Sequence, residues 1–123
     1  MAHSKNISVN VGTNTFSLKN IEVYERMSDE TTAFVADLYV GKIKVGTCEN
    51  SGKGEGNYPC VYGAFERGLM EIVEKEVSKH HFHEDNYYGH TLDWDYSIDF
   101  LIAEMVAYAW ELGHKTYKFS DER

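Results

Sequence analysis

The stretch FVADLYVGKIKVGT, residues Phe34–Thr47, decides the fold class. Apolar and polar side chains alternate along it, which is the two-residue period of a strand with one buried face. The dipeptide Gly41-Lys42 interrupts this alternation with a connection short enough to join two antiparallel strands. We therefore predict a β-hairpin, and the side chains expected on its apolar face are Phe34, Ala36, Leu38, Val40, Ile43, Val45 and Thr47.

Similar alternation precedes this hairpin. It runs through Ile7–Val11 and Ile21–Glu25, and turn-forming residues occupy Gly12–Thr15 and Ser28–Thr31. Residues 7–48 are thus predicted to form an antiparallel meander of four or five strands with one apolar face. The tail Lys115–Phe119 offers a short additional edge strand.

After the loop Glu49–Pro59 the apolar period becomes helical. We predict a first helix over residues 61–81 and a second over residues 97–112, followed by Gly113 as a helix-ending residue. Gly68 lies inside the first helix, where glycine costs about 1 kcal/mol relative to alanine. The expected fold is a single α+β domain over residues 1–123, in which the meander packs against two C-terminal helices and residues 1–6 form a flexible lead.

The second helix is apolar around nearly its whole circumference. Ile98, Leu101, Met105 and Ala109 share one face, whereas Phe100, Ala103, Ala107 and Trp110 share another. Such a helix must be covered on two sides. The sheet or the first helix provides one cover, and a second subunit is the simplest other cover, so we expect a homo-oligomer.

The composition limits the classes of partner. Twenty acidic residues against twelve basic ones give a net charge of −8, which disfavours direct nucleic-acid binding. No apolar run is long enough to cross a membrane, and none resembles a signal peptide. Cys48 and Cys60 are expected to be reduced thiols, which indicates a cytoplasmic protein.

The segment between the helices, KHHFHEDNYYGHTLDWDY (Lys79–Tyr96), holds four of the six histidines and is rich in aromatic residues. We interpret it as a long connecting loop that contributes a ligand site, because flat aromatic rings stack on bases. Phe82, Tyr88 and Trp94 would stack on a base, while His83 and Asn86 would hydrogen-bond its edge or a ribose. Lys53, Arg67 and Arg26 are the expected countercharges for phosphate groups. In the alternative interpretation, Phe82 and Trp94 simply close the core.

Two further segments allow more than one interpretation. The glycine-rich loop Asn50–Asn57 either binds an anion through backbone N–H groups or is a plain flexible connection. His81 and His83, with His80, Glu84, Asp85 or His90, could ligate a metal, but they match no recurring zinc spacing. The opposing interpretation is a polar helix end at which His80 and His81 face the helix dipole. We predict no metal site, no cofactor and no catalytic set, and hence a protein that is not an enzyme.

The wording FVADLYVGKIKVGTCENSGKGEG, Phe34–Gly56, resembles small phage and prophage proteins in which a Gly-Lys turn leads into a glycine-rich loop. The layout of a sheet followed by two helices is similar to the first type of Thoeris anti-defence protein. This resemblance implies a homo-oligomeric sponge in the bacterial host cytoplasm that binds and sequesters a small nucleotide-derived signalling molecule, a cyclic ADP-ribose isomer, without turnover. From the stacking role assigned to Phe82, we further predict that Phe82→Ala would abolish ligand retention without unfolding the protein.

Two other functions stay open. An acidic protein of this size could inhibit a bacterial defence complex by direct contact, using its charged face as a nucleic-acid decoy. The histidine cluster could instead serve a metal-dependent enzyme, which would be sensitive to chelators.

Overall fold

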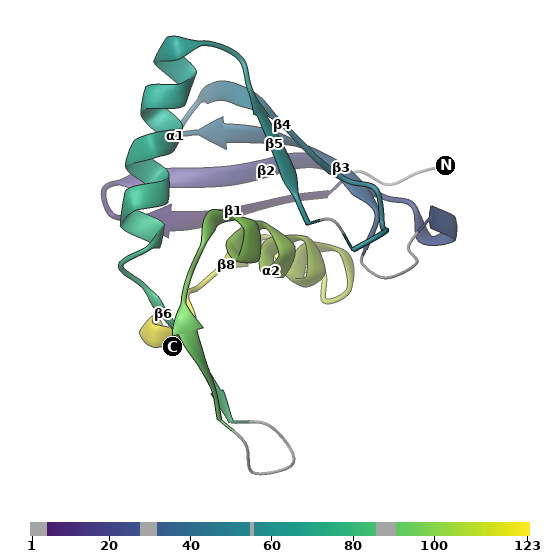
Figure 1. The fold of residues 1–123 in the computed structure, drawn as a ribbon, viewed down its shortest axis with the longest axis vertical. Coiled ribbons are helices and arrows are strands. Elements are labelled where there is room, and N and C mark those ends of the chain that lie inside the picture. The colour runs from purple at the N-terminus through teal and green to yellow at the C-terminus, as the bar shows by residue number, and fades with distance from the viewer. Residues whose placement is uncertain (1–4, 28–31, 55, 86–90) are drawn as a thin grey trace.

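The computed structural model describes residues 5–27, 32–54, 56–85 and 91–123, and it confirms the predicted α+β class. Six strands form the main sheet in the spatial order β5-β4-β3-β2-β1-β8 (Figure 1). Strands β1 to β5 form an antiparallel meander, whereas β8 joins the edge of β1 in parallel. The strand bounds are β1 Lys5–Val11, β2 Asn14–Val23, β3 Phe34–Val40, β4 Ile43–Asn50, β5 Tyr58–Val61 and β8 Thr116–Tyr117.

Two α-helices, α1 (Ala64–Val77) and α2 (Ile98–Trp110), cover one face of this sheet (Figure 1). Both are shorter than predicted. Helix α1 lies between β5, which ends at Val61, and a new strand that begins at His81. Helix α2 is bounded by its caps, Ser97 and Glu111. Two 3₁₀ turns, η1 (Glu25–Met27) and η2 (Ser120–Glu122), complete the described elements. Among the described residues, no helix is long and apolar enough to cross a membrane.

The core lies between the sheet and the two helices. Strand β2 begins at Asn14, earlier than the predicted strand, so Phe16 and Leu18 become fully buried core residues. The helices contribute Met70, Val73, Val77, Leu101, Ile102, Met105, Val106 and Ala109 to the same cluster. The two cysteines are free thiols, one buried at Cys48 and one exposed at Cys60.

A β-bulge corrects the predicted inward face of the second hairpin strand. Leu38 pairs with Gly46, but the next residue, Tyr39, pairs with Lys44, so Val45 is extra in β4. A single added residue reverses the alternation beyond it. Val45 is buried as predicted, whereas Ile43 is 42% exposed and Cys48 takes the core position expected for Thr47.

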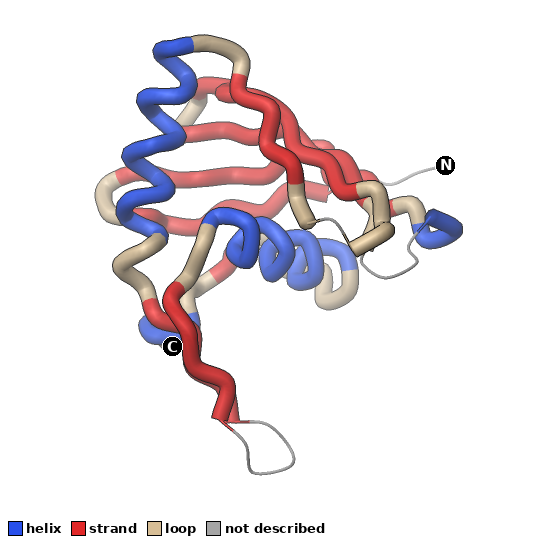
Figure 2. Tube along the Cα trace, in the orientation of Figure 1, coloured by secondary structure: helices blue, strands red, loops and turns tan. Residues whose placement is uncertain are grey.

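The segment between the helices was predicted to be a long loop, but it forms a β-hairpin that is separate from the main sheet. Strands β6 (His81–Asp85) and β7 (Thr91–Asp95) pair antiparallel and project away from the body of the molecule (Figure 2). Phe82 pairs with Trp94 on the side that faces α2. On the other side of the hairpin, His81 and His83 lie opposite Asp95 and Asp93, so the sequence of the segment resembles that of a polar loop.

This hairpin covers part of the second apolar face of α2. The Phe100 ring packs edge-on against both Phe82 and Trp94, at centroid distances of 4.9 and 5.4 Å. At the other end of α2, the Lys5 ammonium lies 5.2 Å from the Trp110 ring centroid. Of this face, Ala103 is the exposed residue. Part of the cover that we assigned to a second subunit is therefore intramolecular, and the homo-oligomer stays a prediction.

Candidate functional site

Of the three predicted stacking residues, the structure describes Phe82, which is buried in the core, and Trp94, which is partly exposed. Phe82 is only 4% exposed, since its ring stacks on Trp94 at 5.0 Å and meets Tyr96 edge-on at 5.8 Å. Trp94 is 39% exposed. The alternative interpretation, in which these residues close the core, therefore describes Phe82, while Trp94 keeps an accessible surface.

Of the remaining predicted hairpin residues, the structure describes only His83. His83 is exposed on β6, and its backbone N–H donates to Ser120 Oγ at 3.1 Å. Asn86 and Tyr88 lie outside the described residues, as do Tyr87 and His90. The hairpin thus places His83 on the side opposite Phe82 and Trp94, because neighbouring strand residues alternate.

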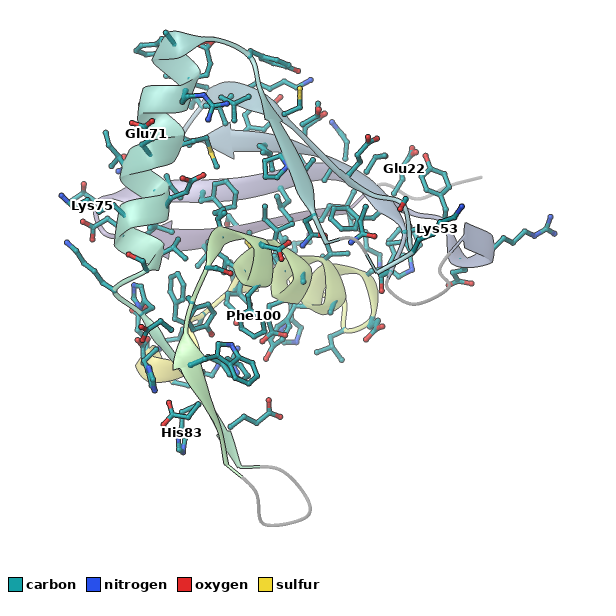
Figure 3. The ribbon with its side chains drawn as sticks, viewed as in Figure 1. Glu22, Lys53, Glu71, Lys75, His83 and Phe100 are labelled. Carbon is teal, nitrogen blue, oxygen red and sulfur yellow. The ribbon has the colours of Figure 1, made fainter. Side chains whose placement is uncertain are left out.

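The predicted countercharges lie on other elements. Lys53 is in the glycine-rich loop, Arg67 is on α1, and Arg26 is in η1. Lys53 and His83 lie at opposite sides of the molecule (Figure 3). The structure therefore does not bring the three cations together with the aromatic residues of the hairpin.

The glycine-rich loop is tied to the start of α2. The Asn57 backbone N–H donates to Asp99 Oδ1 at 2.9 Å, and its side-chain amide donates to the Asp99 carbonyl at 2.8 Å. Gly52, Gly54 and Gly56 have φ angles of 83°, 82° and 88°, a conformation that only glycine adopts readily. A cavity of about 200 Å³ lies between this loop, Phe34 and the Ala103–Ala107 side of α2. Because Asp99 lines it, the cavity is poorly suited to an anion.

A larger groove, of about 500 Å³, lies where β1 extends beyond its short pairing with β8. It is lined by Lys5, Asn6, Ile7, Ser8, Ser17, Lys19, Ala109, Gly113, His114 and Lys115, and we call it the cationic groove. Three of these residues are lysines, and none is acidic. In a chain with a net charge of −8, this is a local reversal of sign.

Hydrogen bonds hold the walls of the cationic groove in place. Lys5 Nζ donates to the Trp110 carbonyl at 2.9 Å, which satisfies a backbone acceptor at the end of α2. The Ser8 backbone N–H donates to the Lys115 carbonyl at 3.1 Å. Gly113, with a φ of 71°, turns the chain so that the His114 N–H reaches the Tyr108 carbonyl at 3.0 Å. An ammonium group has three donors, so Lys5 can still bind an anion.

No local sequence signal marks the cationic groove. Lys5 and Lys19 lie in the first two strands, whereas Lys115 lies near the other end of the sequence, and each occurs in an ordinary polar context. They converge only because β8 returns to the first strand of the sheet. These lysines are therefore absent from the predicted countercharges, which are Lys53, Arg67 and Arg26.

The histidines at the hairpin base contact carboxylates. His81 Nδ1 lies 3.1 Å from Asp95 Oδ1, and its Nε2 contacts Asp93 Oδ1. His80 Nδ1 lies 3.0 Å from Asp121 Oδ1. The backbone N–H of His80 donates to the Val77 carbonyl at 3.0 Å, at the C-terminal end of α1. The dipole interpretation expected the His80 ring at this helix end, but the ring contacts Asp121 instead.

The structure thus offers a cationic groove, a small cavity beside the glycine-rich loop, and a histidine–carboxylate cluster at the hairpin base. The chain matches no protein-family model, no curated protein and no solved structure.

Proposed function

We propose that this protein binds a phosphate-bearing, nucleotide-derived signalling molecule in the cationic groove and sequesters it without turnover. The observation that supports the proposal is the convergence of Lys5, Lys19 and Lys115 on a groove with no acidic lining residue. Lysine is a common phosphate ligand, and clustered cations concentrate an anionic ligand.

The size and polar groups of the groove suit a nucleotide. Its volume of about 500 Å³ is within the range of small-molecule sites. Ser8, Ser17 and Asn6 supply hydroxyl and amide groups for a ribose or a base edge. The Lys19 ammonium lies 4.3 Å from the Tyr39 ring centroid, so this cation is oriented by an aromatic face.

Retention without turnover fits the chemistry of the groove. A hydroxyl nucleophile needs a base within hydrogen-bond reach. Among the described residues, His114 packs edge-on against Tyr108 at 5.4 Å, and no hydrogen bond joins its ring to Ser8 or Ser17. The resemblance to anti-defence sponges suggests the ligand class, namely cyclic ADP-ribose isomers released during a bacterial immune response.

The test is to incubate the protein with a mixture of cyclic ADP-ribose isomers, wash it, release bound molecules by heat and identify them by mass spectrometry. An intact isomer at about one per subunit is the expected result. The double variant Lys19→Ala/Lys115→Ala should retain at least tenfold less at equal protein concentration. The control Lys42→Ala/Lys75→Ala removes two exposed cations outside the groove and should retain the ligand.

Three outcomes would overturn the proposal. A chemically altered product would indicate an enzyme. Loss of retention in Lys53→Ala with none in the groove variant would move the site to the glycine-rich loop. If no isomer is retained, sequestration of this ligand is wrong.

The direct-contact alternative is supported by a different surface. Asp93, Asp95, Asp121 and Glu122 are all exposed on one side of the projecting hairpin or on the adjacent turn η2. Such an acidic surface would suit a basic protein partner. It predicts a stoichiometric complex that weakens steeply with salt and is insensitive to the groove substitutions.

A further inference from the structure

Three side chains from opposite ends of the C-terminal half converge at the hairpin base. His80, which precedes β6, lies beside Asp121 and Glu122 of η2. Its Nδ1 is 3.0 Å from Asp121 Oδ1 and 3.6 Å from Glu122 Oε1, and all three ligand-type atoms lie within 4.8 Å of one another. We propose that these atoms form a binding site for a divalent transition-metal ion, with Zn²⁺ as the probe.

The donor set and its spacing suit such an ion. Zinc binds imidazole nitrogen and carboxylate oxygen at about 2.0–2.2 Å, so ligand atoms around a tetrahedral ion lie about 3.3–3.6 Å apart. The distances of 3.0 and 3.6 Å from His80 Nδ1 bracket this spacing. Three protein ligands leave a position for water, and the half-buried His80 beside exposed carboxylates leaves the ion a route from solvent.

Neighbouring groups orient the ligands. The His80 ring stacks on the buried Phe119 ring at 3.7 Å with an interplanar angle of 5°, which fixes the plane of the imidazole. The His81 backbone N–H donates to Asp121 Oδ2 at 2.7 Å and leaves Oδ1 directed at His80. Metal ligands are commonly positioned by such outer contacts.

The neighbouring histidine has a different arrangement. His81 directs one ring nitrogen at Asp93 and the other at Asp95, so its two carboxylates lie on opposite edges of the imidazole. A single ion beside one nitrogen cannot collect both carboxylates. His81→Ala is therefore a matched control that removes an adjacent, carboxylate-paired histidine and leaves the proposed ligand set intact.

The test measures Zn²⁺ affinity of the full chain by competition with a chromogenic chelator, and thermal unfolding with and without Zn²⁺. The protein should bind one equivalent and unfold at a higher temperature with the ion. His80→Ala and Glu122→Gln should each weaken binding at least tenfold and remove most of the Zn²⁺-dependent shift. His81→Ala and His114→Ala should retain both. Glu122 is exposed, so its substitution tests the site even if His80→Ala, which loses the Phe119 contact, fails to fold.

Equal affinity in wild type and Glu122→Gln would overturn the site and leave His80 and Asp121 as an ion pair only. Losses shared equally by His81→Ala and His114→Ala would identify adventitious binding to surface histidines. Substitution of Co²⁺ gives an independent readout, because a nitrogen and oxygen ligand set produces visible absorption that should disappear in Glu122→Gln. This inference does not depend on the cationic groove, whose variants should bind Zn²⁺ normally.

Discussion

The hydroxyl groups of Tyr96 and Tyr117 lie 2.8 Å apart inside the core. Tyr117 donates to Glu104 Oε1 at 3.2 Å, and Tyr96 accepts from the Ser120 backbone N–H at 3.0 Å. The result is a polar chain that runs from Ser120 through the two tyrosines to Glu104 and links η2, β8 and α2 to the residue after β7. A buried polar chain of this kind stabilises only while each member is satisfied.

Tyr96→Phe removes the middle of this chain and should lower the free energy of unfolding by about 1–3 kcal/mol. The Ser120 N–H would lose its acceptor, and the Tyr117 hydroxyl would lose one partner. Urea denaturation measures the change. Tyr39→Phe, on a half-buried ring beneath Lys19, is the control and should change stability little, so an equal loss in both variants would contradict a special role for the chain.

Glu104→Gln should stabilise the protein more at pH 7 than at pH 4. Burial raises the pKa of Glu104 above its value in the unfolded chain, despite the hydrogen bond from Tyr117. Below the unfolded-state pKa both states are neutral, and as pH rises the unfolded state gains more from ionisation, so wild-type stability falls. Glutamine keeps an acceptor for Tyr117 without the charge. Unfolding curves of both proteins at the two pH values test the sign, and a larger gain at pH 4 would contradict it.

Phe82→Ala should cost about 3–5 kcal/mol, because a buried ring between Trp94, Tyr96 and Phe100 is replaced by a cavity. Trp94→Ala should cost less, since that ring is 39% exposed. Thermal unfolding of the two variants decides between a core role and a ligand role. Unchanged stability of Phe82→Ala with loss of ligand would restore the hypothesis drawn from the sequence.

Gly68→Ala should stabilise the protein by about 1 kcal/mol, the helix propensity difference. A Cβ at Gly68 would have nothing within 4 Å, so no close contact explains this glycine. Gly46→Ala is the matched opposite, because its Cβ would lie 2.0 Å from the Cys60 carbonyl oxygen. That variant should be destabilised. Chemical denaturation gives the free energy of unfolding of each variant. It thus compares the effect of helix propensity at Gly68 with that of a steric clash at Gly46.

The sheet could be predicted because its inward residues repeat every second position, as in Phe34, Ala36 and Leu38. The bulge at Val45 could not, since one extra residue leaves the local composition unchanged and reverses the face only in the paired structure. The β6–β7 hairpin was missed for a related reason. On β6, Phe82 is the one apolar residue, and a single apolar position cannot establish a two-residue period.

The candidate site was less predictable than the fold. Aromatic content identified Phe82 and Trp94 as important, but sequence cannot tell a ring packed under a hairpin from one offered to a ligand. No local sequence pattern distinguishes Lys19 or Lys115. Both line the cationic groove only because the sheet places β2, β1 and β8 side by side. Likewise, His80 and Asp121 are separated by 41 positions, beyond any short metal-binding spacing.

The cationic groove also has a consequence for when the proposed ligand binding can begin. Its walls come from the first strand and from the segment after α2, and the Lys5–Trp110 hydrogen bond joins residues 105 positions apart. Contacts between such distant residues carry the largest loop-closure cost and form late in folding. During translation, the meander can pair on the ribosome well before Lys115 emerges. A nascent chain without the segment after α2 would therefore lack one wall of the groove, and the ligand binding that we propose would begin only when this segment closes the sheet edge.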